Sequence, residues 1–385
     1  MAFLLFLIFL PSLLSATWAE KTLENLSLRE KIGQLFIVAA VADEISLTST
    51  YHYFEPYRVD RSYIDMLICE YGIGGIIYLG TSTLMQEIVA TNIYQSRANI
   101  PLLIAQDCEW GLNQRIPEVI PFPKQKILGA LENSEIIYQV GYQIGLQCKL
   151  VGVHLNLAPV ADLNSNPLNP IINERSFGEN KEKVANCCVL INQGMRDAGI
   201  LTCAKHFPGH GDTFVDSHLA LPIINHDLNR LNQYELYPFK KLIAQNIPCI
   251  MIAHLEVPAL EKDCIPTTFS KNVITFLRNE LGFEGLIITD GLGMGALMNN
   301  YKSGEIELRA LLAGNDILLC PIDVPKAVEL IENAIKENII THEKLDAHVL
   351  KILHAKEAAG IAHRTVIDVN TAINNLLADK VRLIA

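Results

Sequence analysis

The chain has 385 residues, half of them hydrophobic, and a formal net charge of −11 at pH 7. This length permits either two domains or one α/β barrel, and the hydrophobic content excludes a disordered chain. The acidic balance, with no cluster of Lys and Arg, excludes nucleic acid as a partner because phosphate neutralisation needs such clusters.

An apolar run opens the chain, MAFLLFLIFLPSLLSATWA over residues 1–19. It ends in small residues, with Thr17 and Ala19 placed like the −3 and −1 positions of a cleavage site, although no basic residue precedes it. Pro11 and the shortness of the run disfavour a stable membrane anchor. We therefore expect a signal peptide over 1–19 and export to the periplasm or cell envelope.

Eight short apolar runs follow, each with a loop and a helical pattern after it. They span residues 33–41, 72–80, 100–107, 153–162, 200–207, 247–254, 285–290 and 315–320. Near-continuous apolarity is typical of strands buried on both faces of a parallel sheet. Eight such units predict an α/β fold, a single-domain (β/α)₈ TIM-type barrel over residues 20–385 that includes C-terminal helices. A doubly wound open sheet is the alternative, but it normally has fewer strands and a glycine-rich phosphate loop.

The nine cysteines are scattered and include no C-x-x-C pair. An odd number without regular spacing is unlike a disulfide framework. Most lie in apolar segments, and we expect them to be small core residues.

Ionisable residues stand at the ends of five consecutive predicted strands. They are Asp107, Asp162, Lys205 with His206, His254 and Asp290. Barrel enzymes place their chemistry at the C-terminal ends of the strands, where the loops converge. Solvation of the rim does not explain five such ends in a row, so the pattern predicts a polar pocket.

The fifth strand leads into KHFPGHGDTFVDSH, residues 205–218. Taken alone, this stretch is compatible with a metal site, a proton-transfer device or a polar loop. The pair His206 and His210, with carboxylates nearby, has metal-ligand spacing. Pro208 and Gly209 stand between the two histidines, so they do not share one helical face.

The same stretch resembles the signature loop of family 3 glycoside hydrolases, in the branch of bacterial β-N-acetylhexosaminidases. PLLIAQDCEWGLNQR, NLAPVADLNSNPLNPIINERSFG and TTFSKNVITFLRNELGFEGLIITDGLGMGAL resemble further family segments in the same order. The likeness runs from LSLREKIGQLF to the last strand. The chain departs from the family pattern at two positions. Trp110 stands between Glu109 and Gly111 where the family usually has a glycine, which bears on fine specificity, and Gly291 stands where it usually has alanine.

The resemblance implies the roles of the site residues. Asp290 is the expected nucleophile, and His218 the general acid/base, oriented by Asp216. Asp107, Arg115, Arg175, Lys205 and His206 match positions that bind sugar hydroxyls. His210 and His254 are expected to support or pack, and Asp162 and Asp212 to shape loops.

Elementary chemistry agrees with the three catalytic assignments. A retaining glycosidase needs a nucleophile below the sugar and a proton donor beside the leaving oxygen. Asp290 ends a buried strand, although a helix N-cap is an equal reading from position alone. Histidine as a residue type suits proton transfer near neutrality, and a neighbouring carboxylate fixes the tautomer of an imidazole, as expected of Asp216 beside His218. In isolation, Asp-Ser-His is an ordinary solvated turn. Gly209 and Gly211 are expected to let this loop move.

The expected function is therefore a retaining, exo-acting β-N-acetylglucosaminidase without cofactor or metal. The resemblance implies peptidoglycan-derived muropeptides as substrates, and no stable protein partner is expected. For Arg115 and Arg175, structural ion pairs between loops are the competing interpretation. A metal-dependent barrel amidohydrolase and a β-N-acetylglucosaminide phosphorylase remain alternative functions. An inactive sugar-binding module is disfavoured because both catalytic residues are present.

Overall fold

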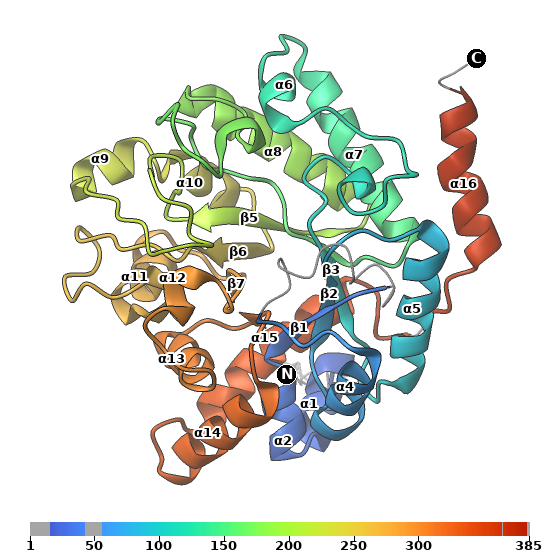
Figure 1. The fold of residues 1–385 in the computed structure, drawn as a ribbon, viewed down its shortest axis with the longest axis vertical. Helices are drawn as coiled ribbons and strands as arrows, with labels where there is room; N and C mark the ends of the chain where they lie inside the picture. Colours follow the sequence, from blue (N-terminus) through green and yellow to red (C-terminus); the bar gives the residue numbers. More distant parts are fainter. Residues whose placement is uncertain (1–15, 43–55, 364, 383–385) are drawn as a thin grey trace, which may run out of the picture.

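A computed structural model describes residues 16–42, 56–363 and 365–382. Eight strands lie at the centre of the molecule, and each falls within one of the eight predicted runs (Figure 1). They are β1 (Phe36–Ala40), β2 (Gly75–Tyr78), β3 (Leu103–Gln106), β4 (Leu155–Asn156), β5 (Leu201–Phe207), β6 (Cys249–Ile252), β7 (Leu286–Thr289) and β8 (Leu318–Leu319).

The strands form one parallel sheet in the order β7-β6-β5-β4-β3-β2-β1-β8. A parallel bridge between Ile288 and Ile317 joins β7 to the segment before β8 and closes the sheet. The amide of Thr289 donates to the carbonyl of Ile317 over 3.0 Å at the same seam. The fold is therefore the predicted (β/α)₈ barrel, because neighbouring strands in sequence are neighbours in space and the edges meet.

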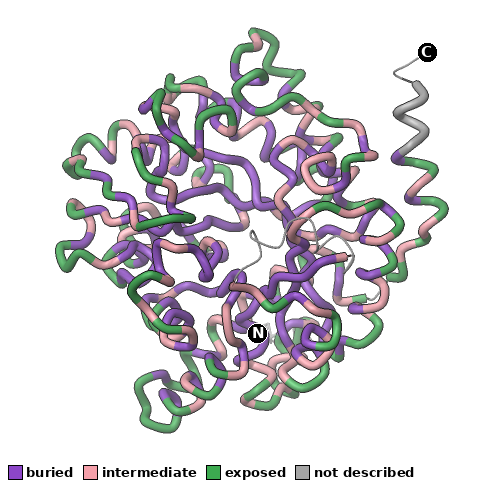
Figure 2. The backbone as a smooth tube through the Cα atoms, viewed as in Figure 1, coloured by how far each residue is buried: buried purple, intermediate pink, exposed green. Residues whose placement is uncertain are grey.

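Helices surround the strands, with their exposed faces outward (Figure 2). They are α1 (Trp18–Asn25), α2 (Leu28–Gly33), α4 (Arg61–Met66), α5 (Leu84–Arg97), α6 (Gln125–Gly129), α7 (Ser134–Leu150), α8 (Lys181–Asp197), α9 (Leu228–Gln233), α10 (Tyr237–Ile243), α11 (Lys271–Thr275), α12 (Gly295–Met298), α13 (Glu305–Ala313), α14 (Val324–Lys336), α15 (His342–Ala358) and α16 (Val369–Arg382). The last helix, α16, packs beside α5 on the outside of the barrel (Figure 1).

Local sequence explains where the longer helices begin. Thr83 and Gln86 form a reciprocal capping box at the start of α5, and the side chain of Asn180 accepts the Lys183 amide at the start of α8. These side chains satisfy amides that have no partner within the helix. Gly314 ends α13 with φ 110°, a left-handed conformation that favours glycine.

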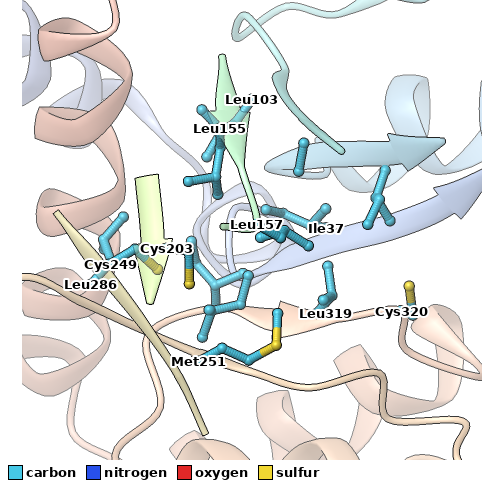
Figure 3. Packing of buried hydrophobic residues seen from close by; sticks show 14 of the residues in the cluster. Ile37, Leu103, Leu155, Leu157, Cys203, Cys249, Met251, Leu286, Leu319 and Cys320 are labelled. Atoms are coloured by element: carbon cyan, nitrogen blue, oxygen red, sulfur yellow. The ribbon is translucent and has the colours of Figure 1, made fainter. Parts of the chain in front are cut away.

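The barrel interior is filled by side chains that meet at its centre. Figure 3 shows contributions from β1 and from β3 through β8, among them Ile37, Leu155, Met251 and Leu319. All four are at most 3 % exposed. Burial on both faces of each strand is the physical reason for the near-continuous apolar runs. The interior is a packed core, so a ligand has access to the barrel only at its ends.

Seven of the nine cysteines are buried, and all nine are free thiols; Cys69 and Cys264 are exposed. This confirms the expectation that most are small core residues. Within the described residues, no helix is both long enough and apolar enough to span a membrane.

Residues 1–15 of the predicted signal peptide lie outside the described residues. The remaining four bear directly on the predicted cleavage point. Thr17 caps α1, and the fully buried Ala19 lies in its first turn. The amide of Trp18 donates to Glu357 of α15 over 2.9 Å. Cleavage after Ala19 would therefore remove the capped start of a helix that packs against the barrel.

Candidate active site

A cavity of about 430 Å³ opens at the C-terminal ends of the strands. Its lining includes all five predicted sugar-binding residues, together with Asp290 and His218. The predicted residues come from segments up to 183 positions apart, from Asp107 to Asp290. The barrel brings them together because parallel strands all end at the same face.

Five charged side chains form one hydrogen-bonded network on the β3–β5 side of the cavity. Asp107 accepts from Arg115 Nη2 over 2.7 Å and from Lys205 Nζ over 2.8 Å. The Glu109 carboxylate accepts hydrogen bonds from Arg175 Nε and Nη2, at 3.0 and 2.7 Å, and lies 2.8 Å from Lys205 Nζ. Arg175 is thus ion-paired between two loops, whereas Arg115 pairs with Asp107 within the loop that follows β3. Both arginines also line the cavity, and their binding of sugar hydroxyls stays a prediction.

The network fixes the charges of its members. Burial acts to raise the pKa of Asp107, but Lys205 and Arg115 outweigh it and hold that pKa far below its usual range. In the same way Arg175 and Lys205 overcome burial and lower the pKa of Glu109 to about 2. Burial alone would lower the pKa of Lys205, yet Asp107 and Glu109 raise it. The cavity therefore presents charged donors and acceptors that are already fixed in position, which is what the orientation of a polar ligand requires.

Glu109 was not among the predicted site residues, although it holds two of them. The sequence signal was its place two residues after Asp107, where an alternating strand-end segment returns the side chain to the same face. A single acid after a strand is common, and only the spatial position of Arg175 and Lys205 gives Glu109 its role.

Asp162 has a more definite function than shaping a loop. Its carboxylate is fully buried and lies 2.7 Å from His206 Nδ1. It also accepts the backbone amides of His206 and His210, at 3.2 and 2.7 Å. The other ring nitrogen of His206, Nε2, lies 3.3 Å from Arg175 Nη2. Asp162 therefore sets the orientation in which His206 faces the cavity.

Asp290 immediately follows β7 and projects into the cavity. Its Oδ1 accepts the amide of Gly291 over 2.8 Å. Burial acts to raise the pKa of Asp290, but His206, His254 and His218 outweigh it and lower the pKa below its usual value. His254 supports the same turn, with Nε2 2.9 Å from the Gly291 carbonyl. The carboxylate is ionised at neutral pH, as a nucleophile must be.

The Asp216–His218 pair has the geometry of an oriented proton donor. Asp216 Oδ1 lies 2.7 Å from His218 Nδ1 and accepts the His218 amide over 2.9 Å. The His218 side chain is 53 % exposed, and the residue lines the cavity. Because Nδ1 is engaged with Asp216, Nε2 is the nitrogen available to a substrate.

The loop that bears this pair is anchored at several points. The carbonyl of His218 accepts the Gly295 amide over 3.0 Å, and Ser217 Oγ lies 3.0 Å from His210 Nε2. A Cβ at Gly211 would lie 1.6 Å from the Leu163 carbonyl oxygen, so glycine is needed there for close packing. Close packing is thus one reason why glycine stands at position 211. That Gly211 also lets the loop move stays a prediction.

The histidines that suggested a metal site are occupied by protein groups. His206 Nδ1 pairs with Asp162, while His210 engages Thr213 through Nδ1 at 2.9 Å and Ser217 through Nε2. Among the described residues, no group of three or more His, Cys, Asp or Glu side chains could hold a metal ion. Asp212 pairs with His226 over 2.6 Å and does not line the cavity, in keeping with a loop-shaping role.

Comparison with known proteins places this geometry in context. Residues 27–355 match the family model described as the glycosyl hydrolase family 3 N-terminal domain. Beta-hexosaminidase A of Pseudoalteromonas piscicida is 33 % identical over 342 residues, which cover 80 % of this chain and 57 % of that protein.

Two solved structures are similar to the whole barrel. A family 3 β-N-acetylglucosaminidase of Paenibacillus is 33 % identical with a TM-score of 0.80, covering 89 % of this chain and 64 % of that one. LpqI of Mycobacterium tuberculosis is 27 % identical with a TM-score of 0.77, covering 89 % and 96 %. This chain thus spans less than two thirds of the Pseudoalteromonas protein and of the solved Paenibacillus chain, and nearly all of the solved LpqI chain.

Proposed function

The chain belongs to glycosyl hydrolase family 3, and we propose that it is a retaining, exo-acting β-N-acetylglucosaminidase. The observation that supports this most directly is one cavity lined by an ionised Asp290, by His218, which Asp216 orients from behind, and by Lys205 with its charged partners. These are the three parts that retaining hydrolysis of a terminal sugar requires: a nucleophile, a proton donor and a set of orienting groups.

In the first step, an oxygen of Asp290 attacks the anomeric carbon while the bond from that carbon to the leaving oxygen breaks. Before this step, Asp216 stabilises the positively charged imidazole of His218. His218 Nε2 then gives its proton to the leaving oxygen. In the second step, His218 takes a proton from water, the water oxygen bonds to the anomeric carbon, and the carboxylate of Asp290 is released. Two inversions leave the β configuration unchanged.

The proposal for the terminal sugar extends to a natural substrate. The similar proteins are named β-hexosaminidases and β-N-acetylglucosaminidases, which supports N-acetylglucosamine as the sugar removed. Muropeptides from peptidoglycan, in a periplasm or cell envelope, are the proposed source of that sugar. This finer assignment rests on the family resemblance together with the apolar segment 1–19.

Phosphate is a second possible acceptor because of one feature of the site. The proton donor is an imidazole that is half exposed, and the nearest carboxylates of the sugar-binding network are neutralised by Lys205 and the two arginines. A phosphate approaching the anomeric carbon therefore meets less repulsion than it would from a carboxylate donor.

The test is turnover of 4-nitrophenyl β-N-acetylglucosaminide and 4-nitrophenyl β-glucoside, each with and without phosphate. We expect the N-acetylglucosaminide to be hydrolysed faster than the glucoside, and we expect a chelator to leave this rate unchanged. Formation of a sugar 1-phosphate at the expense of free sugar would instead assign a phosphorylase. No turnover of either substrate by folded protein would refute the proposed function.

A further inference from the structure

Tyr57 lines the cavity, and its hydroxyl contacts the turn that follows the nucleophile, but the reaction described above does not use it. Tyr57 lines the cavity together with Asp290 and Met294. Its hydroxyl accepts the amide of Gly293, three residues after the nucleophile, over 3.2 Å. The residue thus belongs to the β7 side of the site, across from the charged network that follows β3 and β5.

Two glycines make the space that the Tyr57 ring occupies. A Cβ at Gly293 would lie 2.5 Å from Tyr57 Cε1, and a Cβ at Gly291 would lie 3.0 Å from the Tyr57 hydroxyl oxygen. Neither distance is compatible with a side chain unless the ring shifts. The turn that bears the nucleophile is therefore shaped to hold this phenol close to it.

The phenol is a hydrogen-bond donor with its proton still available. Burial, with Cys320 and Asp290 adding to it, raises the pKa of Tyr57 well above its usual value, so the hydroxyl stays protonated. Its oxygen accepts from Gly293, and the proton has no acceptor among the residues that the structure describes. A bound substrate is the natural acceptor, since Tyr57 lines the cavity.

The surroundings of Tyr57 indicate which part of a sugar it meets. The anomeric carbon must contact Asp290, so the substituent on the neighbouring carbon lies within a few bonds of that residue. Met294 lies near the Tyr57 hydroxyl, because a Cβ at Gly291 would lie 3.0 Å from that oxygen and 3.7 Å from Met294 Cγ. Leu319 and Leu79 add apolar surface to the same cavity. An acetamido group needs this combination, because its carbonyl accepts one hydrogen bond and its methyl prefers an apolar contact.

The geometry points to Tyr57 as the residue that recognises the acetamido group of the terminal sugar, with its hydroxyl donating to the carbonyl oxygen and Met294 packing on the methyl. This inference rests on the proposed function and goes further, since it assigns selectivity for N-acetylated over plain sugars to a residue of the first βα loop.

The experiment uses Tyr57→Phe, which keeps the ring between the two glycines and removes only the hydroxyl. We expect kcat/KM for the 4-nitrophenyl β-N-acetylglucosaminide to fall about tenfold, the effect of one buried hydrogen bond. For the β-glucoside, which has no acetamido group, we expect a change of less than about twofold. An equal loss of kcat/KM for both substrates would mean that the Tyr57 hydroxyl acts on the ring oxygen or on the nucleophile, and it would overturn the inference.

Tyr78→Phe is the matched control. Its hydroxyl is also buried, lies 2.9 Å from Thr91 Oγ1, and does not line the cavity. Both substrates should be turned over by this variant at the wild-type ratio. A shifted ratio here would show that the measurement reports general loosening of the barrel.

Calorimetric binding of free N-acetylglucosamine and glucose gives a readout that does not require turnover. The wild type should prefer N-acetylglucosamine, and Tyr57→Phe should lose most of that preference. If the wild type fails to hydrolyse either aryl glycoside but shows this binding pattern, the proposed function falls and the recognition by Tyr57 stands. Equal affinities of the wild type for the two sugars would overturn the inference about Tyr57.

Discussion

Lys205 Nζ lies 2.8 Å from Asp107 Oδ1, and both groups face a cavity that also contains the nucleophile. The Lys205 side chain is 3 % exposed, so the pair is nearly withdrawn from water. Because Glu109 lies at the same distance from the same nitrogen, one ammonium group bridges two carboxylates, each of which also pairs with an arginine. Lys205 thus holds this end of the barrel together, and it is also one of the residues proposed to bind the sugar.

Lys205→Met should therefore lower both the stability of the protein and its binding of the sugar. It leaves two buried carboxylates with one cation fewer, and we expect the free energy of unfolding to fall by about 3 kcal/mol. Turnover should fall at least about a hundredfold because the sugar is no longer held in place. Denaturant titration and kcat/KM measure the two effects. Lys124→Met, which removes an exposed partner of Glu174, should cost less than about 1 kcal/mol.

Asp290→Ala should reduce turnover on the order of a thousandfold or more while leaving the protein folded, because the covalent partner is lost. Azide should restore release of the phenol by entering the vacated space. Attack from that face inverts the anomeric carbon once, so the product should be the α-glycosyl azide, identified by NMR. Exposed Asp263→Ala is the control. Wild-type activity in clean Asp290→Ala protein would remove the nucleophile assignment.

His218→Ala should harm substrates in proportion to their need for a proton. A nitrophenolate leaves almost unaided, whereas a sugar alkoxide does not. Under single-turnover conditions, cleavage of a disaccharide should therefore slow far more than release of nitrophenol. The variant also lacks the base for deglycosylation, so the glycosyl-enzyme should accumulate. With the activated substrate this should appear as a burst of nitrophenol. Asp216→Asn should give a milder version. Equal losses for good and poor leaving groups would reduce His218 to a loop-shaping residue.

Lys356 should make stability depend on pH in the alkaline range. This lysine of α15 is fully buried, its Nζ donates to Gln34 over 2.7 Å, and burial lowers its pKa to about 7. Between pH 7 and about 10, the unfolded chain binds a proton that the folded protein does not. The free energy of unfolding should therefore rise with pH there, by up to roughly 1.4 kcal/mol per pH unit.

Denaturant titrations at pH 7.5 and 9.5 test this rise. Lys356→Met should flatten it, whereas Lys344→Met, an exposed lysine of the same helix, should leave it as in the wild type. If the free energy of unfolding of Lys356→Met still rises with pH as in the wild type, groups other than Lys356 cause the rise.

The export prediction is tested at the N-terminus of protein from the native host. Mass spectrometry should find residues 1–19, or a large part of them, removed. Because Ala19 is buried in α1 and Trp18 bonds to Glu357, a form that begins at residue 20 should melt at a lower temperature than one that begins at residue 16. An intact Met1 on soluble cytoplasmic protein would contradict export.

The sequence by itself determined the barrel and the position of its chemistry. Runs such as 247–254 and 285–290 are apolar at nearly every residue, which only a strand buried on both faces requires. Eight of them with helical segments between leave little choice of topology. Since all parallel strands end at one face, Asp107, Lys205 and Asp290 could be expected in one pocket before any distance was known.

Only the tertiary structure decided which groups touch. Glu109 and Asp162 look like ordinary loop acids in the sequence, yet they orient Arg175 and His206. Tyr57 precedes the nucleophile by more than two hundred residues, and no local pattern marks it. Such contacts depend on loop paths and on the space left by glycines. Hydrophobic periodicity encodes the burial of a strand, but it carries no information about which polar side chains meet across a barrel mouth.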